Sequence, residues 1–569
     1  MKNKGMAVFL VIILAAVMYF GYNTFTQREY VVMGSEKTDY PDEWNKIIAD
    51  GVNATAIVVN VRGKKYNSTA TDMYMSDDME LMCSTNVVSE MFECAANVFD
   101  NNTLKITRGD EVVQISAGDP LIKNEDKNPY EIDFVCNDKG NFVSISALSQ
   151  LFGYDYKWDY STNQAVISEG DTKVPIPVKY NYEEEGRVNI AKNQGHFGTC
   201  WAFAALTALE TSLLPEEVFD FSEDHMTLNN SYNLTQEEGG DYQMAMAYLT
   251  AWQGPVLEKD DPYGDGVTNS ELEAVKHVQE VQIIPAKDYE EIKRKVLECG
   301  GVQSSIYVAN TNSKLVESGY YDKNNNSYCY SGQSVPNHDI VIIGWDDNYP
   351  KENFEIDVEG NGAFICRNSW GETFGSNGDF YVSYYDTNIG SNNVVYTKIE
   401  DADNYDNIYQ SDLCGWVGQM GYGSGEAYFA NVYTSGDDEE LEAVGFYATD
   451  KNTEYSVYFC EKFENIASLS RRGDPIVSGS FTNPGYYTVN LDKTIHLNKG
   501  QKYAIIVKID TPEAERPVAI EFRNDYQTDT VNIDDGEGYV SYKGIEWEST
   551  EQQHGCNVCL KAFTNDVRE

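Results

Sequence analysis

Residues 194–203 read QGHFGTCWAF, and they lead into an uncharged apolar run over 201–209, WAFAALTAL. A run of this kind predicts a buried helix, with Cys200 in its first turn. The positive end of the helix dipole would lower the pKa of a thiol at that position and favour the nucleophilic thiolate. Gln194 is close enough in sequence to direct its side-chain amide at an oxyanion formed by attack of Cys200. These residues make Cys200 a candidate nucleophile.

A thiol nucleophile needs a general base, and the base needs an orienting group. His338 stands immediately before the apolar, β-branched run 340–344, IVIIG, which predicts a buried strand. Asn368 lies at the end of another short apolar stretch, in the sequence FICRNSWG. An asparagine amide can hold an imidazole in one tautomer, and Trp370 could shield that hydrogen bond from water. The pattern therefore predicts His338 as the base and Asn368 as its orienting group.

Four blocks in this order resemble the signature of the papain family of cysteine peptidases: Gln194, 200–203, 337–338 and 368–371. The likeness extends over residues 175–398 and implies a papain-like two-lobed peptidase domain. It implies that Cys200 is the nucleophile, that His338 moves the proton and that Asn368 orients the imidazole. It also assigns Gln194 and the backbone N–H of Cys200 to the oxyanion, and Gly239, Gly240 and Trp370 to substrate binding. No metal or organic cofactor is implied.

This sequence departs from the family pattern at Phe197, where the family usually has a second cysteine. The region that usually holds its disulfide partner also lacks cysteine, so the absence of that disulfide is consistent, and Phe197 could offset it by packing. His196 and His225 are interpreted as non-catalytic because no pattern pairs them with a thiol. None of these departures removes a group that the chemistry requires.

The N-terminus has two lysines followed by an apolar run over residues 6–22. This order keeps the N-terminus inside the cell and exports the residues after the run. Aromatic residues occupy the place of a small-residue cleavage site. We therefore interpret residues 1–29 as a cytoplasmic stub and a signal anchor in the cell membrane, with the bulk of the chain extracellular. If the segment is cleaved, the protein is secreted.

The composition limits the possible partners. With 91 acidic and 42 basic residues, the formal net charge is −49, which disfavours nucleic acid and suits solubility in an extracellular setting. The 41 tyrosines indicate a folded, β-rich chain. The eleven cysteines form no metal-ligand pattern with histidine, and Cys556 and Cys559 are interpreted as a local disulfide or as two buried thiols.

Residues 30–174 contain a weak internal repeat. The stretches 74–106 and 141–168 each predict a strand, a short helix and a hairpin, with a period of about sixty residues. The region resembles the small α+β domain at the N-terminus of copper amine oxidases, which is repeated in bacterial surface proteins. It contains no histidine that could bind copper. We expect a stalk or spacer.

Residues 410–569 predict a β-sandwich, because alternating stretches are separated by regular turns at 427–433, 441–447, 455–459, 486–489 and 503–509. The segment resembles the lectin-like domain that follows papain-type modules in some bacterial surface peptidases. Its tyrosines either stack on the rings of a cell-surface glycan or are ordinary strand residues. The sandwich either folds separately or packs on the peptidase domain and completes its fold.

The expected fold class is thus multidomain α+β: a papain-like domain flanked by a small α+β repeat domain and a β-sandwich. The expected function is an exported cysteine peptidase, an endopeptidase acting on protein or peptide substrates at the cell surface. One alternative is a surface adhesin or glycan-binding protein with a vestigial peptidase module. Another keeps the thiol chemistry but ends in transpeptidation.

Overall fold

The structure is a computed structural model that describes residues 176–568, apart from 188–189 and 309–317, and shorter stretches between residues 58 and 169. Contacts divide the chain into two compact units, Met1–Asn97 with Val135–Asp171, and Val98–Phe134 with Thr172–Glu569. Within the described part, no helix combines the length and the apolar character needed to cross a membrane. The apolar run 6–22, where we predict the signal anchor, lies outside the described residues.

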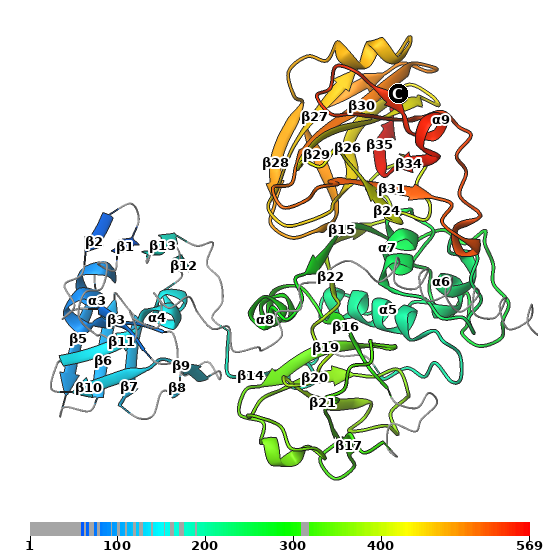
Figure 1. Cartoon of the computed structure of the whole chain (residues 1–569). Helices are drawn as coiled ribbons and strands as arrows, with labels where there is room; N and C mark the ends of the chain where they lie inside the picture. The colour runs from blue at the N-terminus through cyan, green and yellow to red at the C-terminus, as the bar shows by residue number, and fades with distance from the viewer. Residues whose placement is uncertain are drawn as a thin grey trace, which may run out of the picture. The chain divides into compact units, whose positions relative to one another are not determined.

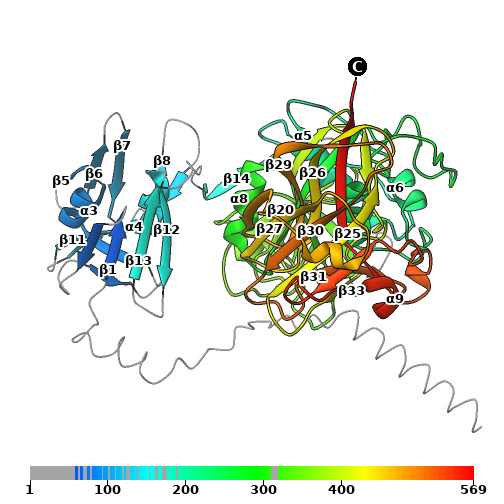
Figure 2. The same cartoon turned by 90° about the horizontal axis from the view of Figure 1, so that it is seen from above.

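The N-terminal region contains the repeated order of elements that the sequence predicts. The first copy has a strand, a helix and a hairpin: β4 (Leu81–Ser84), α3 (Thr85–Phe92), β5 (Ala95–Phe99) and β6 (Thr103–Arg108). The second copy has the same order: β11 (Gly140–Ser144), α4 (Ile145–Leu151), β12 (Tyr154–Asp159) and β13 (Gln164–Glu169). The first strands of the two copies pair antiparallel, with Val143 opposite Cys83, and both helices pack on β4. Figure 2 shows α3, α4 and β11 together in this region. The role of this region as a stalk stays a prediction.

Short strands complete this region: β1 (Val58–Val61), β2 (Lys64–Asn67), β3 (Met73–Met75), β7 (Glu111–Ser116), β8 (Leu121–Lys123), β9 (Pro129–Glu131) and β10 (Phe134–Asn137). β1 pairs parallel with β13, whereas β6–β7 and β8–β9 are antiparallel hairpins.

The region over residues 176–401, where the sequence predicts a papain-like domain, is built around a central buried helix, α5 (Cys200–Leu213). Its other helices are α6 (Glu223–Asn229), α7 (Tyr242–Thr250) and α8 (Tyr289–Glu298), and the 3₁₀ turn η2 spans Lys351–Asn353. The strands are β14 (Lys179–Asn181), β15 (Lys276–Ile284), β16 (Val302–Ile306), β17 (Tyr321–Asp322), β18 (Ser327–Tyr328), β19 (His338–Asp346), β20 (Ala363–Arg367), β21 (Asp379–Ser383) and β22 (Asn393–Asp401).

The apolar character of α5 explains its central position. It is buried on almost every side because it packs on β19, β22 and β16 and also on α6 and α7 (Figure 1). A helix that is apolar all round is stable only when it is covered in this way. α5 packs on β19, which pairs antiparallel with β20. Cys200 at the start of α5 interacts with the backbone N–H of Asp339, so the start of α5 lies beside the start of β19.

The C-terminal region is almost entirely strand, as the sequence predicts. Its strands are β23 (Asn407–Tyr409), β24 (Gly418–Met420), β25 (Glu426–Thr434), β26 (Glu439–Ala448), β27 (Thr453–Cys460), β28 (Val477–Phe481), β29 (Gly485–Leu497), β30 (Lys502–Asp510), β31 (Val518–Phe522), β32 (Gly538–Ser541), β33 (Glu548–Ser549), β34 (Cys556–Val558) and β35 (Leu560–Asp566). The short helices are η3 (Ile466–Ser470), η4 (Tyr526–Thr528) and α9 (Thr550–His554).

One 13-stranded sheet runs through both regions, in the order β17-β18-β21-β20-β19-β16-β22-β15-β29-β26-β35-β23, with β14 added on β19. The crossing point is the antiparallel pair β15–β29, where Val281 lies opposite Tyr486 (Figure 1). Gly485 makes this approach possible, because a Cβ there would lie 2.0 Å from the carbonyl oxygen of Val281. The hydrophobic core around α5 therefore continues into the C-terminal region, where Trp416, Tyr447 and Tyr486 belong to it.

Candidate active site

Cys200 is the first residue of α5, as the sequence predicts, and it is a half-buried residue with a free thiol. All eleven cysteines are free thiols, and Cys556 and Cys559 are buried. Of the two interpretations of that pair, the structure has the two buried thiols. Phe197, at the position of the missing second cysteine, packs edge-on against Tyr263 with ring centroids 6.4 Å apart.

His338 and Asn368 are brought together by the pairing of β19 and β20. Nε2 of His338 lies 2.8 Å from Oδ1 of Asn368, and both side chains are buried. The backbone N–H of Ser369 donates to the same Oδ1 at 2.8 Å, which fixes the orientation of the amide. Because a carbonyl oxygen only accepts, Nε2 carries the ring proton and Nδ1 keeps its lone pair. The neutral imidazole is therefore in the tautomer that can accept a proton.

A short backbone pairing places Gln194 beside the residues that come after Asn368. The N–H of Gln194 donates to the carbonyl of Ser369 at 2.9 Å, and the N–H of Gly371 donates to the backbone carbonyl of Lys192 at 2.9 Å. Oε1 of Gln194 accepts from the Ser369 hydroxyl at 2.6 Å, and its Nε2 donates to the carbonyl of Phe197 at 2.8 Å. One of the two amide hydrogens of Gln194 is thus used within the chain, and the second remains for a ligand.

Trp370 covers the histidine. Its ring stacks on that of His338 with centroids 4.8 Å apart and an interplanar angle of 29°. This placement suits the predicted shielding of the His338–Asn368 hydrogen bond from water.

The glycine pair lies against the start of α5. A Cβ on Gly240 would lie 2.6 Å from Nε1 of Trp201, and a Cβ on Gly198 would lie 3.1 Å from Cα of Gly239. Side chains at these positions would therefore force the segments apart.

The expectation that the Cys200 thiol has a lowered pKa is wrong when Cys200 is considered without proton transfer to His338. Burial raises the pKa of Cys200 to about 12, and the charge of Asp339 adds to this, whereas backbone N–H groups of Asp339, Trp201 and Cys200 lower it. Burial also lowers the pKa of His338 to about 4, against the opposing effect of its bond to Asn368. Desolvation, which depends on the tertiary fold, outweighs the helix start, which the sequence shows. Both shifts favour the neutral thiol and imidazole.

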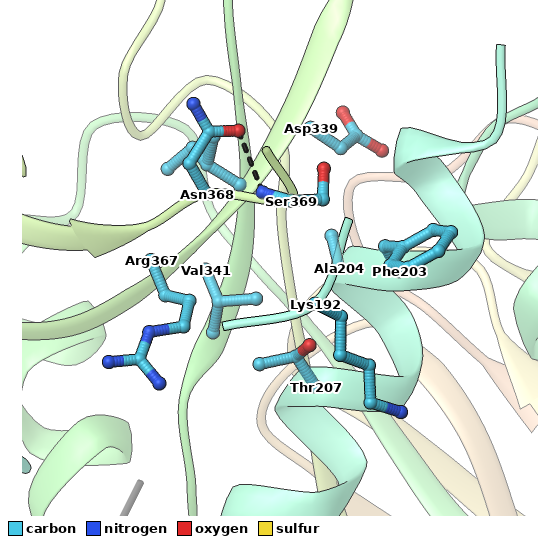
Figure 3. A pocket seen from close by; sticks show the side chains of 10 residues that line it. Lys192, Phe203, Ala204, Thr207, Asp339, Val341, Arg367, Asn368 and Ser369 are labelled. Carbon is cyan, nitrogen blue, oxygen red and sulfur yellow. Dashed lines mark hydrogen bonds between the residues drawn. The ribbon is translucent and has the colours of Figure 1, made fainter. Parts of the chain in front are cut away.

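Asp339 is the site residue that the sequence reasoning missed. Its carboxylate accepts from Ser305 at 2.6 Å and from Gln303 at 3.0 Å, and burial raises its pKa to about 6. It lines a small cavity together with Lys192, residues of α5 and the end of β20 (Figure 3). The sequence feature that could have revealed it is an acidic residue at the start of an otherwise apolar strand.

A buried ion cluster fixes the segment before Gln194. Nζ of Lys192 lies 2.7 Å from Glu210 and 2.8 Å from Glu223, on α5 and at the start of α6. Burial raises the pKa of Glu223 to about 8 even though Lys192 lowers it. No sequence motif marks this cluster.

The two histidines set aside as non-catalytic have other contacts. His225 is buried, with Nδ1 2.6 Å from the hydroxyl of Tyr248, and the ring of His196 lies tilted against Phe197 with centroids 4.3 Å apart. Most strand tyrosines of the C-terminal region are buried, so they cannot stack on a sugar from within the core: Tyr428, Tyr433, Tyr447, Tyr486, Tyr487 and Tyr503. Tyr455 and Tyr458 of β27 are half-buried, so both interpretations stay open for these two.

Comparisons with known proteins agree with this geometry. The model of the papain family cysteine proteases matches residues 176–399, and that of a lectin like domain matches residues 408–564. Cysteine proteinase 1 of Entamoeba histolytica is 27% identical over 218 residues, which cover 36% of this chain and 63% of that protein. Cathepsin L of Sarcophaga peregrina is 28% identical over 224 residues, which cover 36% of this chain and 58% of that protein. The chain thus spans less than two thirds of the length of these relatives.

Two solved structures match both regions together. Cwp84 after propeptide cleavage has a TM-score of 0.61 and 29% identity, covering 68% of this chain and 99% of that chain. The cysteine protease and lectin-like domains of Cwp84, a surface layer associated protein of Clostridium difficile, have a TM-score of 0.60 and 29% identity, covering 68% and 89%. The fold and the site define a papain-like cysteine protease domain. Residues 176–399 thus form a papain-family cysteine protease domain, and a lectin-like domain follows it over residues 408–564; this arrangement, shared with Cwp84, confirms the expected fold class.

Proposed function

We propose that this protein is an exported peptidase that hydrolyses peptide bonds of protein substrates through Cys200, His338 and Asn368. The observation that carries the proposal is the 2.8 Å bond from Nε2 of His338 to Asn368, which leaves Nδ1 of a neutral ring to accept the thiol proton. An adhesin with a vestigial peptidase module would have no need of this tautomer.

The proposed reaction begins with transfer of the Cys200 proton to Nδ1 of His338. The thiolate attacks the substrate carbonyl carbon, and the remaining amide hydrogen of Gln194 and the backbone N–H of Cys200 stabilise the oxyanion. The imidazolium then protonates the leaving amine, and water, deprotonated by His338, hydrolyses the thioester. Since each group by itself favours its neutral form, the thiolate and the imidazolium form as a pair that stabilise each other.

An extracellular or surface location is supported by the likeness to Cwp84, a surface layer associated protein. The apolar run 6–22 with lysines before it supports export and, if it is not cleaved, a single N-terminal anchor. The domain boundaries proposed from the sequence are 1–29, 30–174, 175–398 and 410–569.

Glycan binding by the lectin-like domain is a second proposal, now without the buried strand tyrosines. Tyr422 and Tyr542 are exposed, have ring centroids 5.4 Å apart and lie beside Lys543, whose ammonium is 4.1 Å from the Tyr542 ring. Exposed aromatic faces of this kind are what a sugar ring requires. Loss of retention on cell-wall glycan in Tyr542→Ala, with peptide cleavage unchanged, is the expected result, and unchanged retention would remove this proposal.

The catalytic proposal is tested with the full chain and an epoxide inhibitor directed at papain-type thiols. We expect one covalent adduct, mapped by mass spectrometry to Cys200, and loss of both labelling and peptide hydrolysis in Cys200→Ala without a change in Tm. Cys299→Ala is the matched control, since Cys299 is another half-buried residue with a free thiol in the same domain. Hydrolysis by Cys200→Ala at a rate comparable with wild type would sink the assignment.

A further inference from the structure

The segment before the glycine pair, residues 231–240, is here named the wall segment. It contains no helix or strand. Its later part is fixed to the turn before Cys200, because the N–H of Gly198 donates to the carbonyl of Gln236 at 2.8 Å. The side chain of Gln236 is itself held by Asp224 at 2.7 Å and by Thr227 at 2.8 Å.

The first part of the wall segment is held by the lectin-like domain. The N–H of Asn233 donates to the carbonyl of Gln527 at 2.8 Å, and its side-chain Nδ2 donates to the carbonyl of Tyr526 at 3.1 Å. The hydroxyl of Thr530 donates to the carbonyl of Ser231 at 2.5 Å.

A further contact reaches the residue next to the glycine pair. The hydroxyl of Tyr526 lies 3.4 Å from Oε1 of Glu238, directly before Gly239, and the other carboxylate oxygen of Glu238 accepts from Thr235.

A separate stretch of the lectin-like domain holds the same part of the wall segment. The hydroxyl of Tyr232 donates to the carbonyl of Cys414 at 2.7 Å, and the thiol of Cys414 contacts the carbonyl of Ser231 at 3.3 Å. An irregular segment has no ladder of backbone bonds of its own, so its position depends on such anchors.

The geometry points to a positioning role for the lectin-like domain in peptide binding. Residues 526–530 hold the wall segment, and through it Gly239 and Gly240, at the distance from Cys200 that a bound peptide requires. Tyr526 and Thr530 are positioning residues, since they act through the wall segment and not on the reacting atoms. This inference rests on the proposed function, because it assigns a structural partner to the same site.

The test uses the full chain with Tyr526→Phe and Thr530→Val, singly and together. Both substitutions keep size and remove one hydroxyl contact to the wall segment. Ser478→Ala is the matched control, because it removes a 2.9 Å hydroxyl bond to Ser456 between β27 and β28 of the same domain.

We expect the double variant to lose roughly tenfold in kcat/KM through a higher KM, about the effect of one or two hydrogen bonds. The loss should occur for peptides long enough to reach the glycine pair. The kcat/KM for truncated peptides should stay as in wild type and in Ser478→Ala. The same holds for the rate of iodoacetamide alkylation of Cys200 and for the Tm. An equal loss for long and short peptides, or no loss for either, would overturn the inference.

Amide hydrogen exchange separates this inference from the proposed function. If residues 526–530 hold the wall segment, the double variant exchanges faster over residues 231–240 while α5 stays protected. Unchanged exchange there overturns the positioning role, whether or not the wild-type protein cleaves peptides. Absence of cleavage and labelling in wild type overturns the proposed function alone.

Discussion

The active site and the junction between the two domains differ in what the sequence shows of them. The predicted site residues around Cys200 come from short stretches with a recognisable composition. The residues in contact where β15 meets β29 come from stretches without any such pattern. At that junction Trp252 stacks on His277 with centroids 3.7 Å apart and packs against Phe563 at 5.4 Å. Catalysis needs particular side chains at the ends of particular elements, so few sequences fit. A junction needs only surfaces of matching shape and polarity, which many sequences supply.

The largest effect is expected from removing the lectin-like domain. A chain that ends at Glu400 loses β29, so the edge of β15 is open, and it also loses Trp416, Tyr447 and Tyr486 from the core around α5. We expect insoluble or inactive protein, because an unpaired edge and an exposed apolar face both promote aggregation. Soluble yield, gel filtration and peptide hydrolysis measure this. A soluble truncated chain with full activity would show that the two domains fold independently.

A pair of glycine variants tests the same junction in the full chain. Gly485 and Gly500 both have positive φ, of 149° and 75°, but only Gly485 lies against another strand. Gly500→Ala should cost about 1–2 kcal/mol of unfolding free energy from backbone strain alone. Gly485→Ala should lower the Tm clearly more, since its Cβ would also clash with Val281. Equal changes in Tm would contradict the close approach of β15 and β29.

The contrast also explains what could be predicted from the sequence. The stretch 427–433 predicts β25 almost to its ends because both faces of that strand are mostly apolar and buried, whereas 486–489 predicts only the first part of β29. Most of the rest of β29 is polar and exposed, apart from residues such as the buried Leu497. It is a strand because it pairs with β26, for example at Glu440 and His496. Such pairing is a long-range property that local composition does not report.

The site divides in the same way. Gln194, Cys200, His338 and Asn368 were predicted, because each occupies a motif, and the structure brings His338 to Asn368 and Gln194 to Ser369. The cluster of Lys192 with Glu210 and Glu223 could not be predicted, because its members come from three separate segments. Burial, and with it the direction of the Cys200 pKa shift, depends on the whole fold.

A smaller effect is expected from separating the base from its orienting group. His338→Ala should lose several orders of magnitude in kcat/KM because no group remains to accept the thiol proton. Asn368→Ala should lose less, since it positions the ring without transferring a proton. Steady-state kinetics on one peptide substrate measures both. His225→Ala is the comparison, because it removes a histidine outside the site; a loss of activity as large as that of His338→Ala would contradict the assignment of the base.

The smallest effect concerns Asp339, the residue without a motif. Its carboxyl faces Ser305 and Gln303 on β16, and the other titratable groups that interact with it are Cys200, Tyr396 and Asp241. Its pKa is about 6, and its negative charge raises the pKa of Cys200. In wild type this charge is present above about pH 6 and absent below it. Asp339→Asn removes it at every pH.

The Asn variant should therefore be alkylated by iodoacetamide at Cys200 faster than wild type above pH 6, by up to roughly tenfold, the equivalent of one pKa unit. The two rates should converge near pH 5. Asn can be accommodated because its Oδ1 can still accept from Nε2 of Gln303, while the Ser305 hydroxyl can accept from its Nδ2. Because the folded-state pKa of Asp339 is raised above the usual value for an aspartate, ionisation destabilises wild type as the pH rises towards and beyond 6. The variant should thus gain unfolding free energy relative to wild type at pH 7 but not at pH 4.

Glu372→Gln, which removes an exposed carboxylate near Trp370, should change neither profile. Parallel alkylation profiles for Asp339→Asn and wild type at all pH values would mean that Asp339 does not control the thiol.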